Sequence, residues 1–108
     1  MRVVFMGTPT FAVVVLDSLV EAGHDVVGVY TQPDRGSGRG RRPTSPPVKR
    51  SSLARGLRVY QPDSLRTQAV YDELASLSPE VIAVAAYGRF LPTAILSLPP
   101  LGCLNVHP

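Results

Sequence analysis

Asn105 and His107, two side chains near the end of the sequence, have the types and the spacing of a catalytic pair. Residues two positions apart on an extended strand point to the same face of a sheet. An imidazole transfers protons near neutral pH, and an asparagine amide donates a hydrogen bond to an oxygen that gains negative charge. The pair therefore fits the transfer of an acyl-type group through a tetrahedral intermediate. For an Asn-Val-His triplet without further context, a purely structural role is the more common alternative.

A second chemical feature is a basic segment between Arg35 and Pro62, which contains no acidic residue and has a net charge of +8. The whole chain has a net charge of +3, so the rest of the chain is acidic. A glycine-spaced arginine loop beside an acidic body fits a polyanionic partner. A solvated loop and helix face is the alternative. The basic residues are Arg35, Arg39, Arg41, Arg42, Lys49, Arg50, Arg55 and Arg58.

The elements that position these residues begin with a strand, a helix and a second strand. A short apolar run over residues 2–6 is typical of a buried parallel strand. Helical periodicity follows, with Thr8 or Thr10 as the expected cap and Gly23 as the stop. Residues 25–31 then form the second strand. A strand, a helix and a strand within ~30 residues predict a right-handed crossover in a parallel sheet.

The rest of the chain repeats this alternation, which predicts an α/β fold. We expect a doubly wound, Rossmann-like, mostly parallel sheet with helices on both faces. The glycines and prolines after the second strand exclude a regular helix there, so that stretch is expected to be an irregular loop. The predicted elements are the loop over residues 32–47, a helix over 48–55, a strand over 57–60, a helix over 65–77 capped by Ser64, a strand over 81–86, a helix over 93–98 and a strand over 103–107.

Several classes of protein are disfavoured. The longest apolar stretches, such as residues 81–86, are far below the ~20 residues of a membrane helix, and residues 1–23 lack a signal-peptide pattern. Residues 7–12 lack the second and third glycines of a dinucleotide fingerprint. Cys103 is the one cysteine, so an intramolecular disulfide or a cysteine metal site is excluded. We expect a soluble cytoplasmic domain, or a piece of one, without a metal.

Six motifs occur in the order and spacing found in methionyl-tRNA formyltransferases, and the chain resembles this family over essentially all 108 residues. Asn-x-His alone would indicate only the wider formyltransferase superfamily, whereas its combination with the glycine–arginine loop is highly specific. The motifs are Gly7-Thr8-Pro9-Thr10-Phe11-Ala12, Thr31-Gln32-Pro33-Asp34-Arg35, Gly38-Arg39-Gly40, Ser45-Pro46-Pro47-Val48-Lys49, Ala86-Tyr87-Gly88 and Asn105-Val106-His107.

The resemblance implies transfer of a formyl group from 10-formyltetrahydrofolate to the α-amino group of methionine on the initiator tRNA. It implies that Asn105 holds the formyl oxygen as this becomes an oxyanion. His107 would help to stabilise that oxygen and assist proton movement. Arg89, Phe90 and Leu91 lie where relatives build part of the folate pocket.

The resemblance also implies a binding site for tRNA in the basic segment. The loop that holds Arg39, Arg41 and Arg42 corresponds to the insertion that contacts the acceptor end of the tRNA in the family, and Arg35 and Lys49 flank it. Phosphate contacts by basic side chains supply affinity and orientation. The full-length protein is expected to be a monomer.

Family members are much longer than this chain. A Ser-Leu-Leu-Pro folate-binding segment, a catalytic Asp and a C-terminal β-barrel domain are expected after Pro108. Residues 1–108 are therefore expected to be the N-terminal part of the catalytic domain, truncated before the domain is complete, and to be inactive alone.

Two alternatives remain open at this point. One is a folate-dependent formyltransferase with a small acceptor, such as a nucleotide sugar or glycinamide ribonucleotide, which has no need of the arginine loop. The other is a non-catalytic RNA-binding module that uses the loop alone.

Replacing Arg39, Arg41 and Arg42 together by Ala in the full-length protein should weaken binding of tRNA and leave folate binding almost unchanged. Each lost phosphate contact should reduce the slope of log affinity against log salt by up to ~0.9. Titrations of tRNA at several salt concentrations measure this slope. An unaltered affinity and slope would contradict the assignment of the loop.

Overall fold

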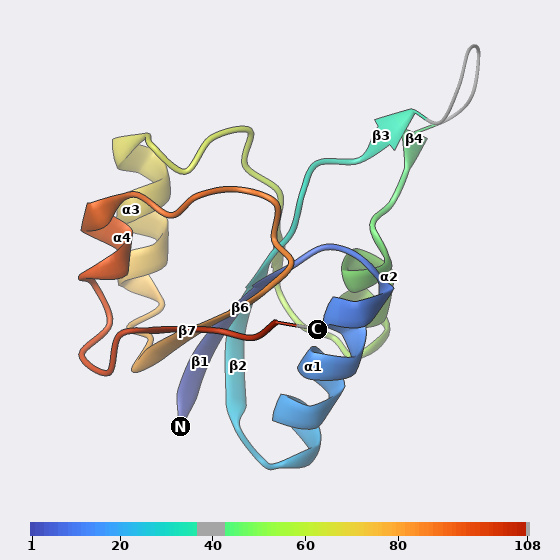
Figure 1. Ribbon diagram of the computed structural model, residues 1–108, viewed down its shortest axis with the longest axis horizontal. Coiled ribbons are helices and arrows are strands. Elements are labelled where there is room, and N and C mark those ends of the chain that lie inside the picture. The colour runs from blue at the N-terminus through green and yellow to red at the C-terminus, as the bar shows by residue number, and fades with distance from the viewer. Residues whose placement is uncertain (37–42, 108) are drawn as a thin grey trace.

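The computed structural model describes residues 1–36 and 43–107, which form a layered α/β arrangement with a projecting hairpin (Figure 1). A five-stranded parallel sheet has the strand order β5-β2-β1-β6-β7. The strands are β1 (Arg2–Gly7), β2 (Asp25–Tyr30), β5 (Val59–Tyr60), β6 (Val81–Ala85) and β7 (Cys103–Asn105). The helices are α1 (Thr10–Glu21), α2 (Pro47–Ala54), α3 (Gln68–Ser76) and α4 (Thr93–Leu96). This arrangement confirms the expected doubly wound fold class.

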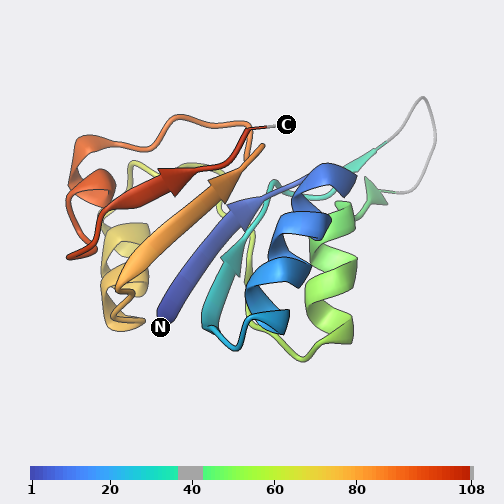
Figure 2. The same cartoon turned by 60° about the horizontal axis from the view of Figure 1, so that its bottom comes forward.

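Helices cover both faces of the sheet, with α1 and α2 on one side and α3 and α4 on the other (Figure 2). The central strand β1 supplies both cores because successive side chains point to opposite faces. Val3 and Phe5 pack toward α1 and α2, whereas Val4 and Met6 pack toward α3 and α4. All four side chains are buried. An apolar run, without polar alternation, is therefore what this strand requires.

The strand order places the topological switch between β1 and β6. The chain moves outward from β1 through β2 to β5, and it then returns to the other side of β1 at β6. Open α/β sheets bind ligands at the carboxyl ends of the strands beside such a switch. The loops that follow β1 and β6 therefore lie where a ligand site is expected.

Two of the expected helix caps are wrong. No side chain caps α1, whose N-cap residue is Pro9, because the Thr8 hydroxyl is bonded elsewhere. The helix expected from residue 65 begins at Gln68, and its cap is Thr67, whose hydroxyl accepts from the amide of Val70 at 3.2 Å. Ser64 instead accepts from the amide of Arg66 in the turn before the helix.

The loop expected over residues 32–47 contains regular structure at both ends. Strands β3 (Arg35–Gly36) and β4 (Pro43–Thr44) pair in antiparallel fashion and form the stem of a hairpin that projects from the body (Figure 1). Glycine and proline exclude a helix there, but they allow a short two-stranded ladder. The expectation of an irregular loop was therefore wrong for the stem.

Replacing Gly7 by Ala should lower the free energy of unfolding by about 1–3 kcal/mol, the usual cost of forcing extra volume into a packed core. An added Cβ would lie 2.7 Å from the carbonyl oxygen of Ala85 and 2.7 Å from the Cβ of Ala12. Neither neighbour can rotate away, since one is backbone and the other is fixed in α1. Urea denaturation measures the loss.

Gly28→Ala in β2 is the matched control for Gly7→Ala. The added Cβ would meet only side-chain atoms, 2.8 Å from Leu77 Cδ1 and 3.2 Å from Tyr60 Cε2. These side chains can shift, so the loss should be smaller. A larger cost for Gly28→Ala than for Gly7→Ala would contradict the close approach of β1, α1 and β6.

Candidate active site

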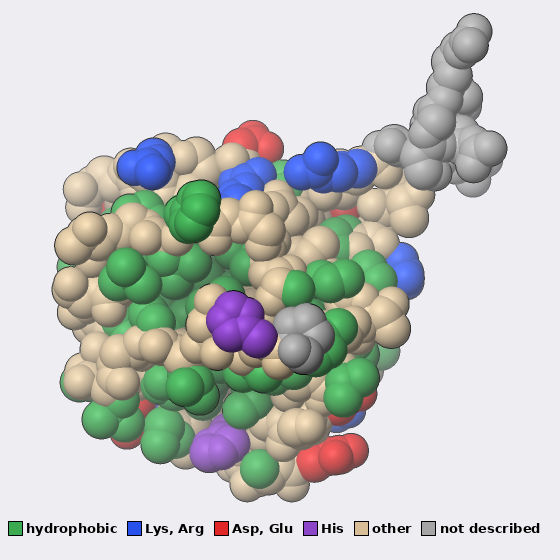
Figure 3. All heavy atoms as spheres, viewed as in Figure 1, with side chains coloured by type: hydrophobic (Ala, Val, Ile, Leu, Met, Phe, Trp, Pro, Cys, Tyr) green, Lys and Arg blue, Asp and Glu red, His purple; other side chains and the backbone are tan. Residues whose placement is uncertain are grey.

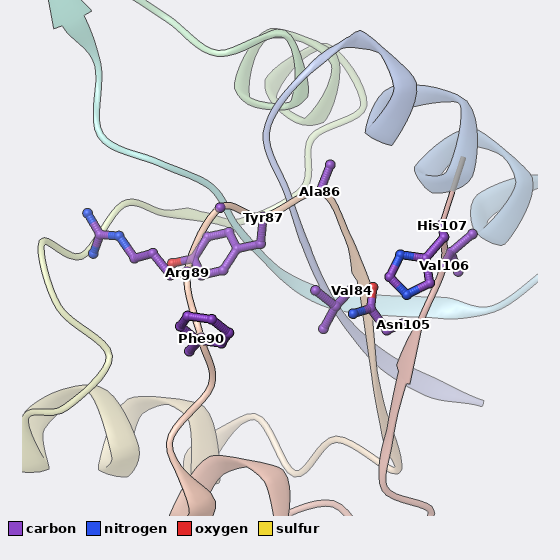
Figure 4. A pocket seen from close by; sticks show the side chains of 9 residues that line it. Val84, Ala86, Tyr87, Arg89, Phe90, Asn105, Val106 and His107 are labelled. Atoms are coloured by element: carbon purple, nitrogen blue, oxygen red, sulfur yellow. The ribbon is translucent and has the colours of Figure 1, made fainter.

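A cavity of about 460 Å³ opens at the carboxyl ends of β6 and β7, and we call it the catalytic cavity after the role that the sequence predicts for Asn105 and His107. It brings together four of the five residues that the sequence predicts for catalysis and folate binding: Arg89, Phe90, Asn105 and His107. Figure 4 shows these side chains around the end of β6. The remaining lining residues are Val84, Ala86, Tyr87, Gly88 and Val106.

Strand β7 positions Asn105 and His107. Asn105 pairs with Val84 as the last residue of the ladder, and the amide of Val106 donates to the carbonyl of Val84 at 2.7 Å. The strand expected over residues 103–107 thus ends at Asn105. The hydrogen bond from the Val106 amide keeps the backbone beside β6 for one more residue before His107. Asn105 and His107 are exposed, and Figure 4 shows both side chains directed toward the cavity.

The two polar groups of this pair are available to a ligand. Among the described residues, the structure gives neither side chain a hydrogen-bond partner, so their donors face the open cavity. An amide and an imidazole side by side can both donate to one carbonyl oxygen as it gains charge. This arrangement suits attack on a carbonyl carbon.

The three residues expected at the folate pocket have different environments. The Arg89 guanidinium donates to the carbonyl of Pro62 at 3.0 Å and to that of Asp63, so it anchors its own loop rather than reaching into the cavity. The Phe90 side chain is 94% exposed at the cavity rim. Leu91 packs against the core beside α3 and α4 and does not line the catalytic cavity.

The wall of the cavity depends on a tight turn over residues 86–88. Ala86 has a φ of 52° and Gly88 a φ of 94°, so both adopt the left-handed region. The carbonyl of Tyr87 between them accepts two hydrogen bonds, from Thr8 Oγ1 at 2.9 Å and from Gln32 Nε2 at 3.1 Å. A non-glycine residue keeps a positive φ where the surroundings hold it there. These two donors hold this turn.

Thr8 and Gln32 were not among the site residues predicted from the sequence. Each follows the end of a strand, Thr8 after β1 and Gln32 after β2, and each belongs to one of the six motifs given above; these two features could have indicated them. The Thr8 hydroxyl also accepts from the amide of Gln32, at 3.4 Å, so the two loops are linked directly. Their partner, Tyr87, is separated from them by more than fifty residues, a pairing that no local pattern reveals.

Tyr87 is buried, and its ring forms part of the cavity wall. Within the described part of the chain its hydroxyl has no hydrogen-bond partner. Burial raises the pKa of this phenol above its ordinary value, so the group is neutral over the physiological range. Tyr87 therefore contributes shape rather than charge.

A second cavity of about 460 Å³ lies on the other side of the turn, and we call it the hairpin cavity. It shares Ala86, Tyr87 and Gly88 with the catalytic cavity, so the two spaces are neighbours across one wall. Arg35 and Thr44 of the hairpin stem line its outer side. The other lining residues are Thr8, Pro9, Gln32, Pro33, Ser45, Pro46 and Pro47.

The basic residues predicted for tRNA binding fall into three groups. Arg35 lines the hairpin cavity and is exposed, whereas Lys49 is paired with Asp34 at 3.0 Å. Arg39, Arg41 and Arg42 lie outside the described residues. Figure 3 shows Lys and Arg side chains along the edge of this face from which the hairpin projects.

Residues 1–36 and 43–107 contain neither a metal-binding cluster nor a membrane-spanning helix. No three His, Cys, Asp or Glu side chains among them lie close enough together to hold a metal ion. Every helix in these ranges is too short or too polar to cross a membrane.

Comparison with known proteins relates the whole chain to one family. Residues 1–108 match the formyl transferase family. The chain is 56% identical over 108 residues to a methionyl-tRNA formyltransferase of Chloroflexus aurantiacus, and 57% identical over 107 residues to that of Pelotomaculum thermopropionicum. It covers 35% and 34% of these proteins, so it spans about a third of their length.

A solved structure with the same fold is glycinamide ribonucleotide transformylase 1 from Symbiobacterium toebii. The TM-score is 0.67 over the entire chain, which corresponds to 51% of that protein. The sequence identity is 18%, so the likeness concerns the fold.

Thr8→Val should lower the free energy of unfolding by about 1–3 kcal/mol, the net value of two hydrogen bonds. The substitution keeps the shape of the side chain and removes both its donor to the Tyr87 carbonyl, which still accepts from Gln32, and its acceptor for the Gln32 amide. Thr10→Val, at the exposed first residue of α1, is the control and should change stability by less than about 0.5 kcal/mol. Equal effects of the two substitutions in urea denaturation would count against the role of Thr8.

Proposed function

The chain belongs to the formyl transferase family, and on this basis we propose that it is the N-terminal part of the catalytic domain of a methionyl-tRNA formyltransferase. The observation that carries the proposal is identity of 50–57% to methionyl-tRNA formyltransferases along nearly the entire chain. Two features of the fold agree with it. The Asn105–His107 pair lies at one cavity, and Arg35 of the hairpin stem lines the cavity next to it.

The proposed reaction moves a formyl group from 10-formyltetrahydrofolate to the α-amino group of methionine on the initiator tRNA. The amine nitrogen forms a bond to the formyl carbon, and the bond from that carbon to N10 of the folate breaks. The proton that the amine loses ends on N10. No metal is required, because the charge that develops on the formyl oxygen can be stabilised by hydrogen bonds.

Asn105 and His107 supply those hydrogen bonds in this proposal. The Asn105 amide donates to the formyl oxygen in the tetrahedral intermediate. His107, on the same side of the cavity, stabilises the same oxygen and assists transfer of the proton from the amine. Tyr87 and Phe90 contribute apolar walls beside the pair, and the pair itself is accessible to a substrate.

The folate donor is proposed to bind in the catalytic cavity beside Phe90, and the acceptor end of the tRNA to approach from the hairpin. Arg35 and the arginines of the hairpin contribute contacts with phosphates. The reaction belongs to translation initiation, which places the protein in the cytoplasm, and we propose a monomer.

The two other functions account for fewer observations. If the protein were a formyltransferase with a small acceptor, the basic segment between residues 35 and 58 would have no binding partner. If it were a non-catalytic RNA-binding module, the amide and imidazole that face the catalytic cavity would have no function. The proposed enzyme uses both features.

Asn105→Ala in the full-length protein should lower kcat by ~10²–10³, the usual cost of one oxyanion donor. Binding of tRNA should be nearly unchanged. His107→Ala should lower kcat similarly and alter the pH profile of the remaining activity. Formylation of methionyl-tRNA and a separate tRNA titration measure the two effects.

His24→Ala is the control for these variants, since His24 lies between α1 and β2, at the opposite ends of the strands. Its turnover should equal that of the parent. Near-normal turnover of both the Asn105 and the His107 variant would remove the pair from the chemistry.

A further inference from the structure

The hairpin stem is closed at its base by one carboxylate. Asp34 directly precedes β3, and Ser45 directly follows β4. The Ser45 hydroxyl lies 3.5 Å from Asp34 Oδ2, just beyond the register pair of Arg35 and Thr44. Asp34, at the base of one arm of the hairpin, therefore connects to Ser45 at the base of the other arm.

Two further side chains attach this point to the body. Lys49 Nζ donates to both carboxylate oxygens of Asp34, at 3.1 and 3.0 Å, from the first turn of α2. Gln61 Nε2 donates to Asp34 Oδ1 at 2.7 Å and to the carbonyl of Gln32 at 3.1 Å. Gln61 directly follows β5, so the contacts connect the hairpin to α2 and to the edge of the main sheet.

The charges of this cluster are compensated within it. The Lys49 side chain is 23% exposed and that of Asp34 is 32% exposed, so the pair is partly withdrawn from water. Hydrogen bonds from Gln61 and Lys49 lower the pKa of the Asp34 carboxyl below its ordinary value. The carboxylate stays ionised at neutral pH, and both of its oxygens accept from the Lys49 ammonium.

The cluster also determines the position of a cavity wall. Arg35 follows Asp34 directly, and Arg35, Thr44 and Ser45 all line the hairpin cavity. A shift of Asp34 would move both arms of the stem, and with them the part of the cavity lining that the stem supplies. The position of Asp34 at the base of the stem thus determines where the stem lies at the hairpin cavity, which is the surface that the proposed acceptor meets.

We propose that Asp34, Lys49 and Gln61 form a polar clamp that positions the basic hairpin for the tRNA acceptor end. Lys49 is then a positioning residue, which replaces its role as a phosphate contact predicted from the sequence. The inference rests on the proposed function, because it names tRNA as the molecule that the hairpin meets.

Asp34→Asn distinguishes the clamp from simple electrostatics by the sign of its effect. Removing a negative charge beside a polyanion site should strengthen tRNA binding if charge alone matters. The clamp predicts the opposite, because an amide has one acceptor oxygen and no charge and so binds the Lys49 ammonium more weakly. The affinity of the full-length protein should fall roughly two- to fivefold, the scale of a partly exposed ion pair. Asp63→Asn is the control with the same charge change at an exposed position, and its affinity should stay equal or rise.

Lys49→Met tests the other partner through the salt dependence. A lost phosphate contact would reduce the slope of log affinity against log salt by about 0.7–0.9. The clamp predicts a weaker affinity with an almost unchanged slope, partial recovery in Lys49→Arg, and no further loss when Lys49→Met is added to Asp34→Asn. An increased affinity of Asp34→Asn, a slope reduced by a full contact in Lys49→Met, or additive losses would each overturn the proposal.

A readout without tRNA separates the clamp from the proposed function. Titration of the Asp34 carboxyl by ¹³C NMR should give a pKa below its ordinary value, and this pKa should rise toward the ordinary value in Gln61→Leu and in Lys49→Met. The interaction is thus retained at neutral pH and lost as the pH falls through the pKa of the folded protein. Absence of tRNA binding by the parent protein would contradict the proposed function, whereas an unshifted pKa in the parent would contradict the clamp.

Discussion

The carbonyl of Tyr87 is the point on which the site depends. It accepts hydrogen bonds from Thr8 and Gln32, and so connects the loops that follow β6, β1 and β2. These bonds hold a turn in which two residues have positive φ, and Gly88 leaves room for the Gln32 side chain, since a Cβ there would lie 2.8 Å from Gln32 Nε2. Both cavities share this turn as a wall, so their separation and their shapes follow from it.

The turn separates two different kinds of chemistry. On one side, an amide and an imidazole face a cavity with largely apolar walls, an environment suited to stabilising a developing oxyanion. On the other side, Arg35 of the hairpin stem lines a cavity whose walls contain four prolines, so one basic side chain beside rigid walls can contact a polyanion there. The proposed reaction needs both sides, because the acceptor must arrive from one and be formylated at the other.

Some of the positive charges in the basic segment are paired with carboxylates of the same chain. Lys49 is neutralised by Asp34, and Arg55 forms a similar ion pair with Asp17 of α1, at 2.8 Å. These pairs tie α2 to the hairpin and to α1. The net charge of +8 in the sequence therefore overstates the charge that a nucleic acid would meet, since part of it serves to fix the elements that present the rest.

The sequence by itself determined the layers of the fold, because the apolar runs of β1 and β6 are typical of a sheet covered on both faces. The order of the strands was not predicted, since it depends on which strands pair across the completed sheet. The sequence also indicated Asn105 and His107, since strand periodicity is local and the carboxyl edge follows from the parallel topology. Only the tertiary structure decided how the loops meet. The bond from Thr8 to Tyr87 spans 79 positions in the chain, and the partner of Lys49 lies on another element, so neither is encoded in a local pattern. A hydroxyl or an ammonium can bond to many acceptors along the chain, and the packing of the sheet and helices determines which acceptor lies within reach.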